Sequence, residues 1–174
     1  MSLKKFIKKE RKLWHQHFIP SLIAGVGMAL ITFVFEFTTS GIVIFASVGA
    51  SAIILANNKS HHLTKLRTSI FAYIIAVTVS TILFYLNQFF QFHLSVSLFL
   101  AVFSVSIAMY LLNVFHPPAI SATVAFLLFE RGVVDLIFLL LSVIMMLIVI
   151  RILSYIFSQH LSLREFYKEF RKEF

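Results

Sequence analysis

The tripeptide His116-Pro117-Pro118 interrupts a long apolar part of the sequence, and this interruption constrains the fold more than any other feature. A proline inside a helix lacks a backbone N–H donor, and its ring clashes with the preceding turn. At membrane depth, every backbone group that this break releases needs a partner inside the protein. A titratable helix break at such a depth is typical of a cavity or a pathway for a polar solute.

The composition indicates a membrane protein. Hydrophobic residues make up 60% of the 174 residues and charged residues 13%, whereas a soluble domain carries about a quarter charged residues. Phenylalanine alone occurs 21 times, which suits a lipid-facing surface. We expect one transmembrane domain over residues 19–157. Residues 1–18 form a basic amphipathic interfacial segment, and residues 158–174 form a cytoplasmic amphipathic tail.

Six apolar runs predict an all-α polytopic membrane protein with five to six transmembrane helices, one of them broken at His-Pro-Pro. The runs cover residues 19–35, 41–56, 68–86, 94–114, 119–129 and 133–157. If 119–129 crosses the membrane, the chain has six passes. If that run turns back, the chain has five spans and a re-entrant segment, and the C-terminus is outside. We favour six passes.

Positive charge is concentrated at both ends of the chain and in residues 57–67, and residues 87–93 contain no Lys or Arg. The positive-inside rule then places both termini and the 57–67 loop in the cytoplasm. The net charge of +8 therefore indicates contact with anionic lipid in the cytoplasmic (inner) membrane, and we expect no nucleic acid as a partner.

The sequence offers little for enzymatic or metal chemistry. It contains no cysteine, so thiol catalysis and thiolate metal sites are excluded. His61 and His62 are adjacent, but further ligands for a metal are not evident. No Ser-His-Asp or paired-carboxylate arrangement is convincing. We expect no enzyme activity, no cofactor and no metal.

The double proline predicts the start of a new helix at Pro117, because proline is well accommodated in a first helical turn. Pro118 would follow in that turn. The helix N-terminus carries about half a positive charge, and the backbone N–H groups of Ala119 and Ile120 would be free nearby. Such an end, lying below the membrane surface, would favour a small anion.

Polar side chains near this helix start support the same hypothesis. His116 adds a donor, and Ser121 and Thr123 add hydroxyl groups, so together they predict a small-anion site. The alternative is a structural kink in which His116 bonds to a neighbouring carbonyl group. For an isolated His-Pro-Pro we weigh the two interpretations about equally.

A run of small residues, 47–52, is the second feature of interest. Gly49 and Ser51 lie in this run, which taken alone indicates close helix packing more than a site. Six spans divide into three plus three, so the two halves would have opposite orientations. Gly49-Ala50-Ser51-Ala52 then corresponds to Ala119-Ile120-Ser121-Ala122, which suggests an inverted 3+3 repeat with a midplane site.

These motifs resemble the HPP family of integral membrane proteins, which is named for the tripeptide. The resemblance rests on 49–52 followed by His116-Pro117-Pro118-Ala119, and it covers about 19–157. It implies a small multi-spanning protein, generally described with about four transmembrane helices. Some members are linked to nitrite transport. This sequence differs from the common pattern at Ile120, where a glycine is usual, and in having no proline in 57–67.

The leading hypothesis is a membrane transporter or channel for a small inorganic anion such as nitrite. His116 would act as a donor or as a proton-linked gate. The expected partners are the lipid bilayer, the anion and, given the small size of the chain, further copies of it in a homo-oligomer. The alternative is a non-transporting membrane scaffold or assembly protein, which predicts a dry, well-packed centre around His116.

Overall fold

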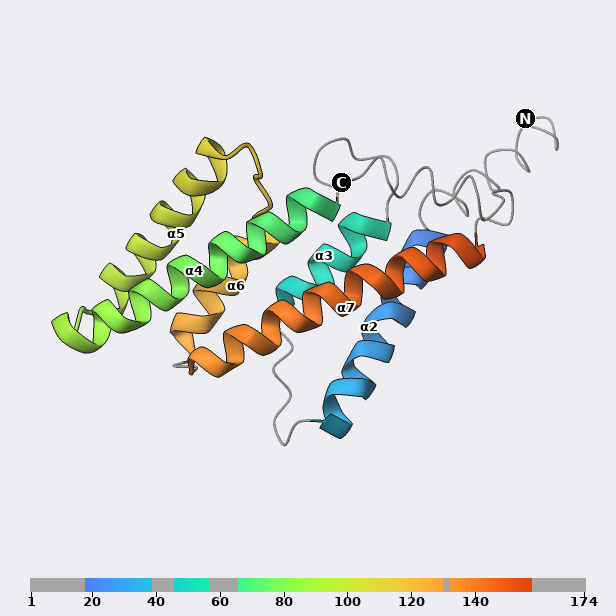
Figure 1. Ribbon diagram of the computed structural model, residues 1–174, viewed down its shortest axis with the longest axis horizontal. Helices are drawn as coiled ribbons and strands as arrows, with labels where there is room; N and C mark the ends of the chain where they lie inside the picture. Colours follow the sequence, from blue (N-terminus) through green and yellow to red (C-terminus); the bar gives the residue numbers. More distant parts are fainter. Residues whose placement is uncertain (1–17, 39–45, 57–65, 130–131, 158–174) are drawn as a thin grey trace, which may run out of the picture.

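The computed structural model describes residues 18–38, 46–56, 66–129 and 132–157, and in these ranges the regular structure is entirely helical (Figure 1). The helices are α2 (Ile19–Thr38), α3 (Ala46–Ala56), α4 (Leu66–Phe90), α5 (Leu94–Leu111), α6 (Pro117–Leu128) and α7 (Val133–Phe157). The predicted all-α class is confirmed. The terminal amphipathic segments and most of the 57–67 loop lie outside the described residues.

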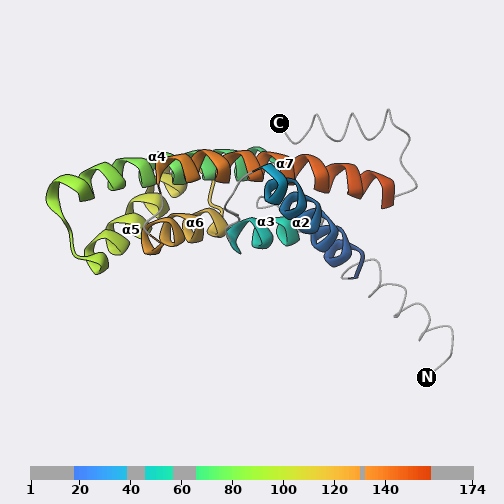
Figure 2. The same ribbon diagram turned by 90° about the horizontal axis from the view of Figure 1, so that it is seen from below.

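The helices form two layers (Figure 2). The long helices α4 and α7 lie side by side in one layer. The other layer is a row in the order α5, α6, α3 and α2. Helix α4 packs on α5 and α6, whereas α7 packs on α2 and α3, and α3 contacts α6 at the middle of the row. The centre of the molecule is therefore the place where α3, α4, α6 and α7 meet.

Helix length distinguishes two kinds of segment. Helices α4, α5 and α7 are long and apolar enough to cross a membrane. Apolar parts of α2, α3 and α6 are shorter. At about 1.5 Å per residue, α6 covers roughly 18 Å of a hydrocarbon core about 30 Å thick. It begins beside the end of α5 and ends beside the start of α7, so α5, α6 and α7 alternate in direction (Figure 1). This alternation favours six passes.

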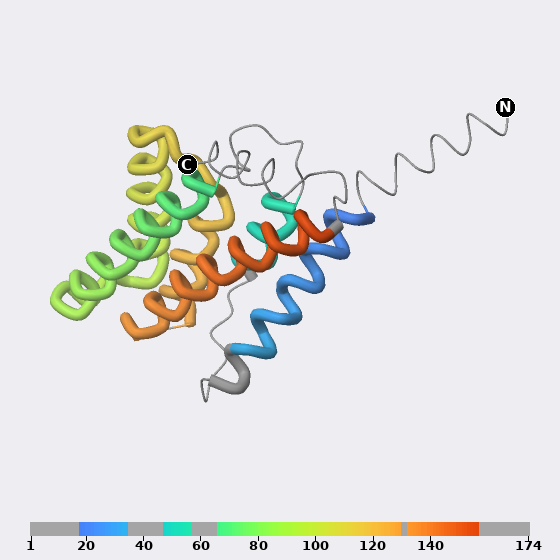
Figure 3. The backbone as a smooth tube through the Cα atoms, turned by 45° about the vertical axis from the view of Figure 1, so that its right-hand side comes forward, coloured from blue at the N-terminus to red at the C-terminus, as the bar shows by residue number. Residues whose placement is uncertain are grey.

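The described helices divide into two equivalent halves, α2–α4 and α5–α7. Exchanging α2 with α5, α3 with α6 and α4 with α7 reproduces the helix pairs that pack together. Figures 1 and 3 show each helix running opposite to its counterpart. Three helices per half and opposite directions are the features of an inverted repeat. The packing therefore supports the expected 3+3 arrangement.

The pattern of buried residues extends this equivalence to single positions. Six buried residues of α4 recur at the same spacing in α7: Leu66, Ser69, Ala72, Tyr73, Ala76 and Ser80 match Leu136, Leu139, Ser142, Val143, Met146 and Ile150. In the short helices, the buried residue of α6 that matches Ser51 is Ala122, because Ser121 is exposed. The structure therefore pairs Ser51 with Ala122, whereas the alignment of the tetrapeptides 49–52 and 119–122 pairs Ser51 with Ser121.

Candidate functional site

The end of α5 directs the chain back toward the centre of the bundle. Asn113 has a φ of 54°, a left-handed conformation that asparagine adopts more readily than most residues. Its N–H donates to the carbonyl oxygen of Tyr110 at 3.1 Å, and the N–H of Val114 donates to that of Met109 at 2.9 Å. These two bonds form a Schellman motif, which satisfies carbonyl groups that the helix end would leave unpaired. The predicted span 94–114 therefore ends as a helix at Leu111.

Helix α6 begins where the double proline predicts. His116 precedes the helix in an extended conformation, and Pro117 and Pro118 occupy its first turn. The N–H of Ala119 donates to the carbonyl oxygen of His116 at 3.0 Å, so this donor is not free, contrary to expectation. The imidazole of His116 does not cap its own helix, and it is available for contacts with other helices.

The imidazole instead joins a buried hydrogen-bonded chain that links three helices. Its Nε2 atom lies 2.9 Å from the Oγ atom of Ser51 in α3. The same hydroxyl lies 2.8 Å from the hydroxyl of Tyr73 in α4, which donates to the carbonyl oxygen of Ser47 at 3.0 Å. All four residues are buried. We call Ser47, Ser51, Tyr73 and His116 the His116 cluster.

The number of protons in the cluster assigns the direction of each bond. Tyr73 has one hydroxyl proton, and it goes to the carbonyl oxygen of Ser47. Tyr73 must therefore accept the proton of the Ser51 hydroxyl, and Ser51 must accept a proton from Nε2 of His116. In the neutral imidazole, the proton then resides on Nε2, and Nδ1 carries a lone pair.

Nδ1 of His116 is a buried polar atom with no hydrogen-bond partner, and the whole residue is 0% exposed. The hydroxyl oxygens of Ser47 and of Ser69, which lies one turn before Tyr73 in α4, are likewise buried and unpartnered. Each such group costs about 1–3 kcal/mol when it is left unsatisfied. Unpaired polar atoms on α3, α4 and the start of α6 are therefore suited to a polar ligand or to water.

The structure brings some of the predicted site residues together. Ser51 and His116 are in direct contact. Pro118 and Ala119 are buried in the first turn of α6, next to His116. Thr123 is buried too, but its hydroxyl donates to the carbonyl oxygen of Ala119 at 3.4 Å. The Thr123 hydroxyl is therefore partly satisfied within its own helix.

Other predicted site residues lie away from the cluster. Pro117 and Ser121 are exposed, and the Ser121 hydroxyl lies 3.5 Å from the carbonyl oxygen of Pro117 in its own helix. Gly49 lies on the side of α3 that faces α2, because a Cβ atom placed there would be 3.8 Å from Cε of Met28. Helix α3 is continuous through this glycine, so Gly49 serves packing and does not mark a break.

Sequence reasoning missed two members of the cluster, Tyr73 and the carbonyl group of Ser47. A signal for Tyr73 was present, because tyrosine in membrane helices is enriched at the interfaces and this one lies inside a predicted span. Ser69, Tyr73 and Ser80 also share one buried face of α4 with small alanines. A polar stripe on an otherwise apolar helix is a sign of a buried polar contact.

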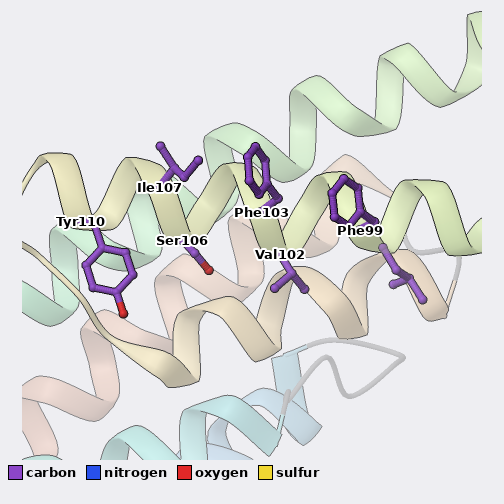
Figure 4. A pocket seen from close by; sticks show the side chains of 7 residues that line it. Phe99, Val102, Phe103, Ser106, Ile107 and Tyr110 are labelled. Carbon is purple, nitrogen blue, oxygen red and sulfur yellow. The ribbon is translucent and has the colours of Figure 1, made fainter.

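A separate groove of about 550 Å³ lies on the outer side of α5 (Figure 4). Its lining comes from α5 alone and includes the stacked rings of Phe99 and Phe103. The polar side chains in it are Ser106 and Tyr110. No charged residue lines this groove, so it is suited to apolar groups such as lipid chains and not to an anion.

Metal binding gains no support in the described part of the chain, where no group of three or more His, Cys, Asp or Glu residues could hold an ion. Asp135 instead accepts a hydrogen bond from the N–H of Gly132 at 3.1 Å and so caps the start of α7.

The sequence matches the family model described as "HPP, transmembrane region" over residues 9–166, which is most of the chain. No curated protein matches the sequence significantly, and neither does any solved structure.

Proposed function

The chain belongs to the HPP transmembrane family, and from this premise we propose that it is an integral membrane transporter or channel for a small inorganic anion such as nitrite. The observation that carries the proposal is the unpartnered Nδ1 of His116 at the centre of the bundle. An ionisable side chain buried inside a membrane protein usually marks a functional site.

The surroundings of His116 support the proposal. The unpartnered hydroxyl of Ser47, a residue whose carbonyl oxygen belongs to the cluster, would donate to an anion, as would that of Ser69, one turn before Tyr73 in α4. The opposed halves provide the architecture in which transporters place a site near the membrane midplane. The polar contacts of the His116 cluster are not repeated by the symmetry of the two described halves, because Ala122 and Val143 occupy the positions equivalent to Ser51 and Tyr73. One chain would thus hold one anion site.

The proposal also covers the membrane location, the orientation and the oligomeric state of the protein. The excess of positive charge at both ends supports a cytoplasmic location of the termini in an inner membrane. The 19.9 kDa mass favours a homo-oligomer as the working unit. The exposed aromatic and aliphatic side chains of α5 contribute to the surface on which lipid or a neighbouring copy would pack.

The test is uptake of labelled nitrite by proteoliposomes that contain the purified protein, with protein-free liposomes as the control. We expect saturable uptake that unlabelled nitrite reduces. Nitrate and formate are added separately as competitors to define the range of anions. Absence of nitrite uptake, by protein shown to be folded, would contradict nitrite transport.

A second candidate function has an observation in its favour. His116 is fully buried, and one of its ring nitrogens is already bonded to Ser51, as expected for a non-transporting scaffold in which the tripeptide shapes the bundle. That function predicts a loss of stability, and no change in any solute flux, when His116 is replaced.

A further inference from the structure

We infer that His116 takes up one proton for each anion that binds, so that the protein carries the anion and the proton together without net charge. The inference rests on the proposed anion transport and adds that anion binding is coupled to proton uptake. It begins with the proton count in the His116 cluster, in which Nε2 donates to Ser51 and Nδ1 of the neutral ring offers only a lone pair.

An anion is a hydrogen-bond acceptor, as is the lone pair on Nδ1. The neutral ring therefore repels the solute that the site is proposed to bind. The other hydroxyl hydrogens of the cluster's chain of bonds already have acceptors. The Ser51 hydroxyl donates to the Tyr73 hydroxyl, and the Tyr73 hydroxyl donates to the carbonyl oxygen of Ser47. None of these groups can turn toward an anion without breaking a bond inside the cluster.

Protonation removes this conflict. A hydronium ion transfers a proton to the lone pair of Nδ1, so that one O–H bond of the hydronium breaks and a water molecule remains, while the Nε2–H···Ser51 hydrogen bond persists. Nδ1–H then donates to an oxygen of the anion, in a charge-assisted hydrogen bond. The imidazolium and the anion together carry no net charge. Burial of such a pair costs far less than burial of either charge alone.

The neighbours of the ring support this assignment. Tyr73 of α4 is the titratable side chain next to His116, with ring centroids 5.8 Å apart, and α3 contributes the hydroxyl of Ser51. In the four helices that meet at the centre, α3, α4, α6 and α7, the charged residues are Arg67 in the first turn of α4, Asp135 in the first turn of α7 and Arg151 in the last two turns of α7. His116 is thus the group at the centre suited to carry the proton.

The experiment counts protons during binding. Nitrite is added to the purified full-length protein in weakly buffered detergent solution. A pH indicator measures the protons taken up, and calorimetry measures the nitrite bound. We expect about one proton taken up per nitrite bound. His116→Gln offers an amide N–H to Ser51 but cannot hold the proton. It should bind nitrite at least about tenfold more weakly, a loss of roughly 1.4 kcal/mol, with no proton uptake.

The possible results separate the two proposals. Nitrite binding without proton uptake would overturn the coupling and leave anion transport standing. Proton uptake that persists in His116→Gln would assign the proton to another group and so overturn the inference. Absence of nitrite binding, together with absence of uptake by proteoliposomes, would overturn the proposed function and the coupling with it.

A second measurement needs no variant at the site. In protein labelled with ¹⁵N-histidine, with the His116 signal assigned by its absence from His116→Gln or His116→Ala, we expect Nε2 protonated and Nδ1 unprotonated before nitrite is added. Both nitrogens should be protonated after addition. A ring with its proton on Nδ1 in the anion-free protein would contradict the inference.

Discussion

Nε2 of His116 lies 2.9 Å from Oγ of Ser51, and this bond joins the residue before α6 to the middle of α3. The two helices belong to opposite halves of the repeat and meet at the centre of the row beneath α4 and α7. A polar contact between halves at this place links the packing of the bundle to the proposed anion site. Replacement of either partner should therefore affect transport more than folding.

Ser51→Ala tests this contact, and Ser121→Ala is its matched control. Both serines lie in short apolar helices, but Ser51 is buried in the His116 cluster and Ser121 is exposed. Without the Ser51 hydroxyl, the imidazole loses the group that orients it. We expect nitrite uptake to fall about tenfold in Ser51→Ala, as for the loss of one well-placed hydrogen bond. Ser121→Ala should transport normally, and equal effects of the two substitutions would contradict the assignment.

Tyr73→Phe removes one hydroxyl and keeps the ring. The carbonyl oxygen of Ser47 and the hydroxyl of Ser51 would each lose a partner. Hydrogen bonds between membrane helices contribute roughly 1 kcal/mol, so the free energy of unfolding in detergent should fall by roughly 1–2 kcal/mol. Tyr110→Phe, a change on the exposed side of α5, is the control. Unaltered stability of Tyr73→Phe would show that this chain of bonds does not hold α3 to α4.

The contact between α2 and α7 can be tested at two glycines of the same helix. A Cβ atom at Gly27 would lie 3.4 Å from Cγ1 of Ile150 and 3.7 Å from Cγ1 of Val149, whereas one at Gly25 meets nothing within 4 Å. Gly27→Leu should overpack this contact and destabilise the bundle by about 1–3 kcal/mol. Gly25→Leu should leave stability unchanged or raise it. Similar unfolding transitions for the two variants would contradict the packing of α2 on α7.

The proposed topology can be tested with single cysteines, because the native chain has none. Gln91→Cys lies between α4 and α5, and Lys59→Cys lies in the basic loop between α3 and α4. In intact cells, a membrane-impermeant thiol reagent should label Gln91→Cys and not Lys59→Cys. Labelling in the reverse pattern would place the termini outside.

Much of the fold could be predicted from the sequence, because its signals are local. Apolar runs predict the six helices that the structure describes, and the double proline predicts the start of α6 at Pro117. Asn113 was a further local signal for the end of α5, since it adopts the left-handed conformation of the helix cap. The short length of α3 and α6 was harder to predict from the sequence, because the apolar runs continue beyond the ends of these helices.

The site could be predicted only in part, because it depends on which helix faces meet. His116 was identified from its place beside the prolines, and Ser51 from a run of small residues. Their contact with Tyr73 depends on how α3 and α4 each pack against α6, which no local pattern specifies. Ser121 resembles Ser51 in its sequence neighbourhood, but the phase of its helix turns it outward.

The most direct test of the central claim compares nitrite uptake by wild-type protein and by His116→Ala in proteoliposomes, with both proteins shown to be folded by their helical circular dichroism and elution in detergent. If His116 lies in the anion pathway, wild-type protein gives saturable uptake and His116→Ala loses at least about nine-tenths of the rate, as expected when a charge-assisted hydrogen bond is removed. Equal rates for the two folded proteins would contradict this role of His116.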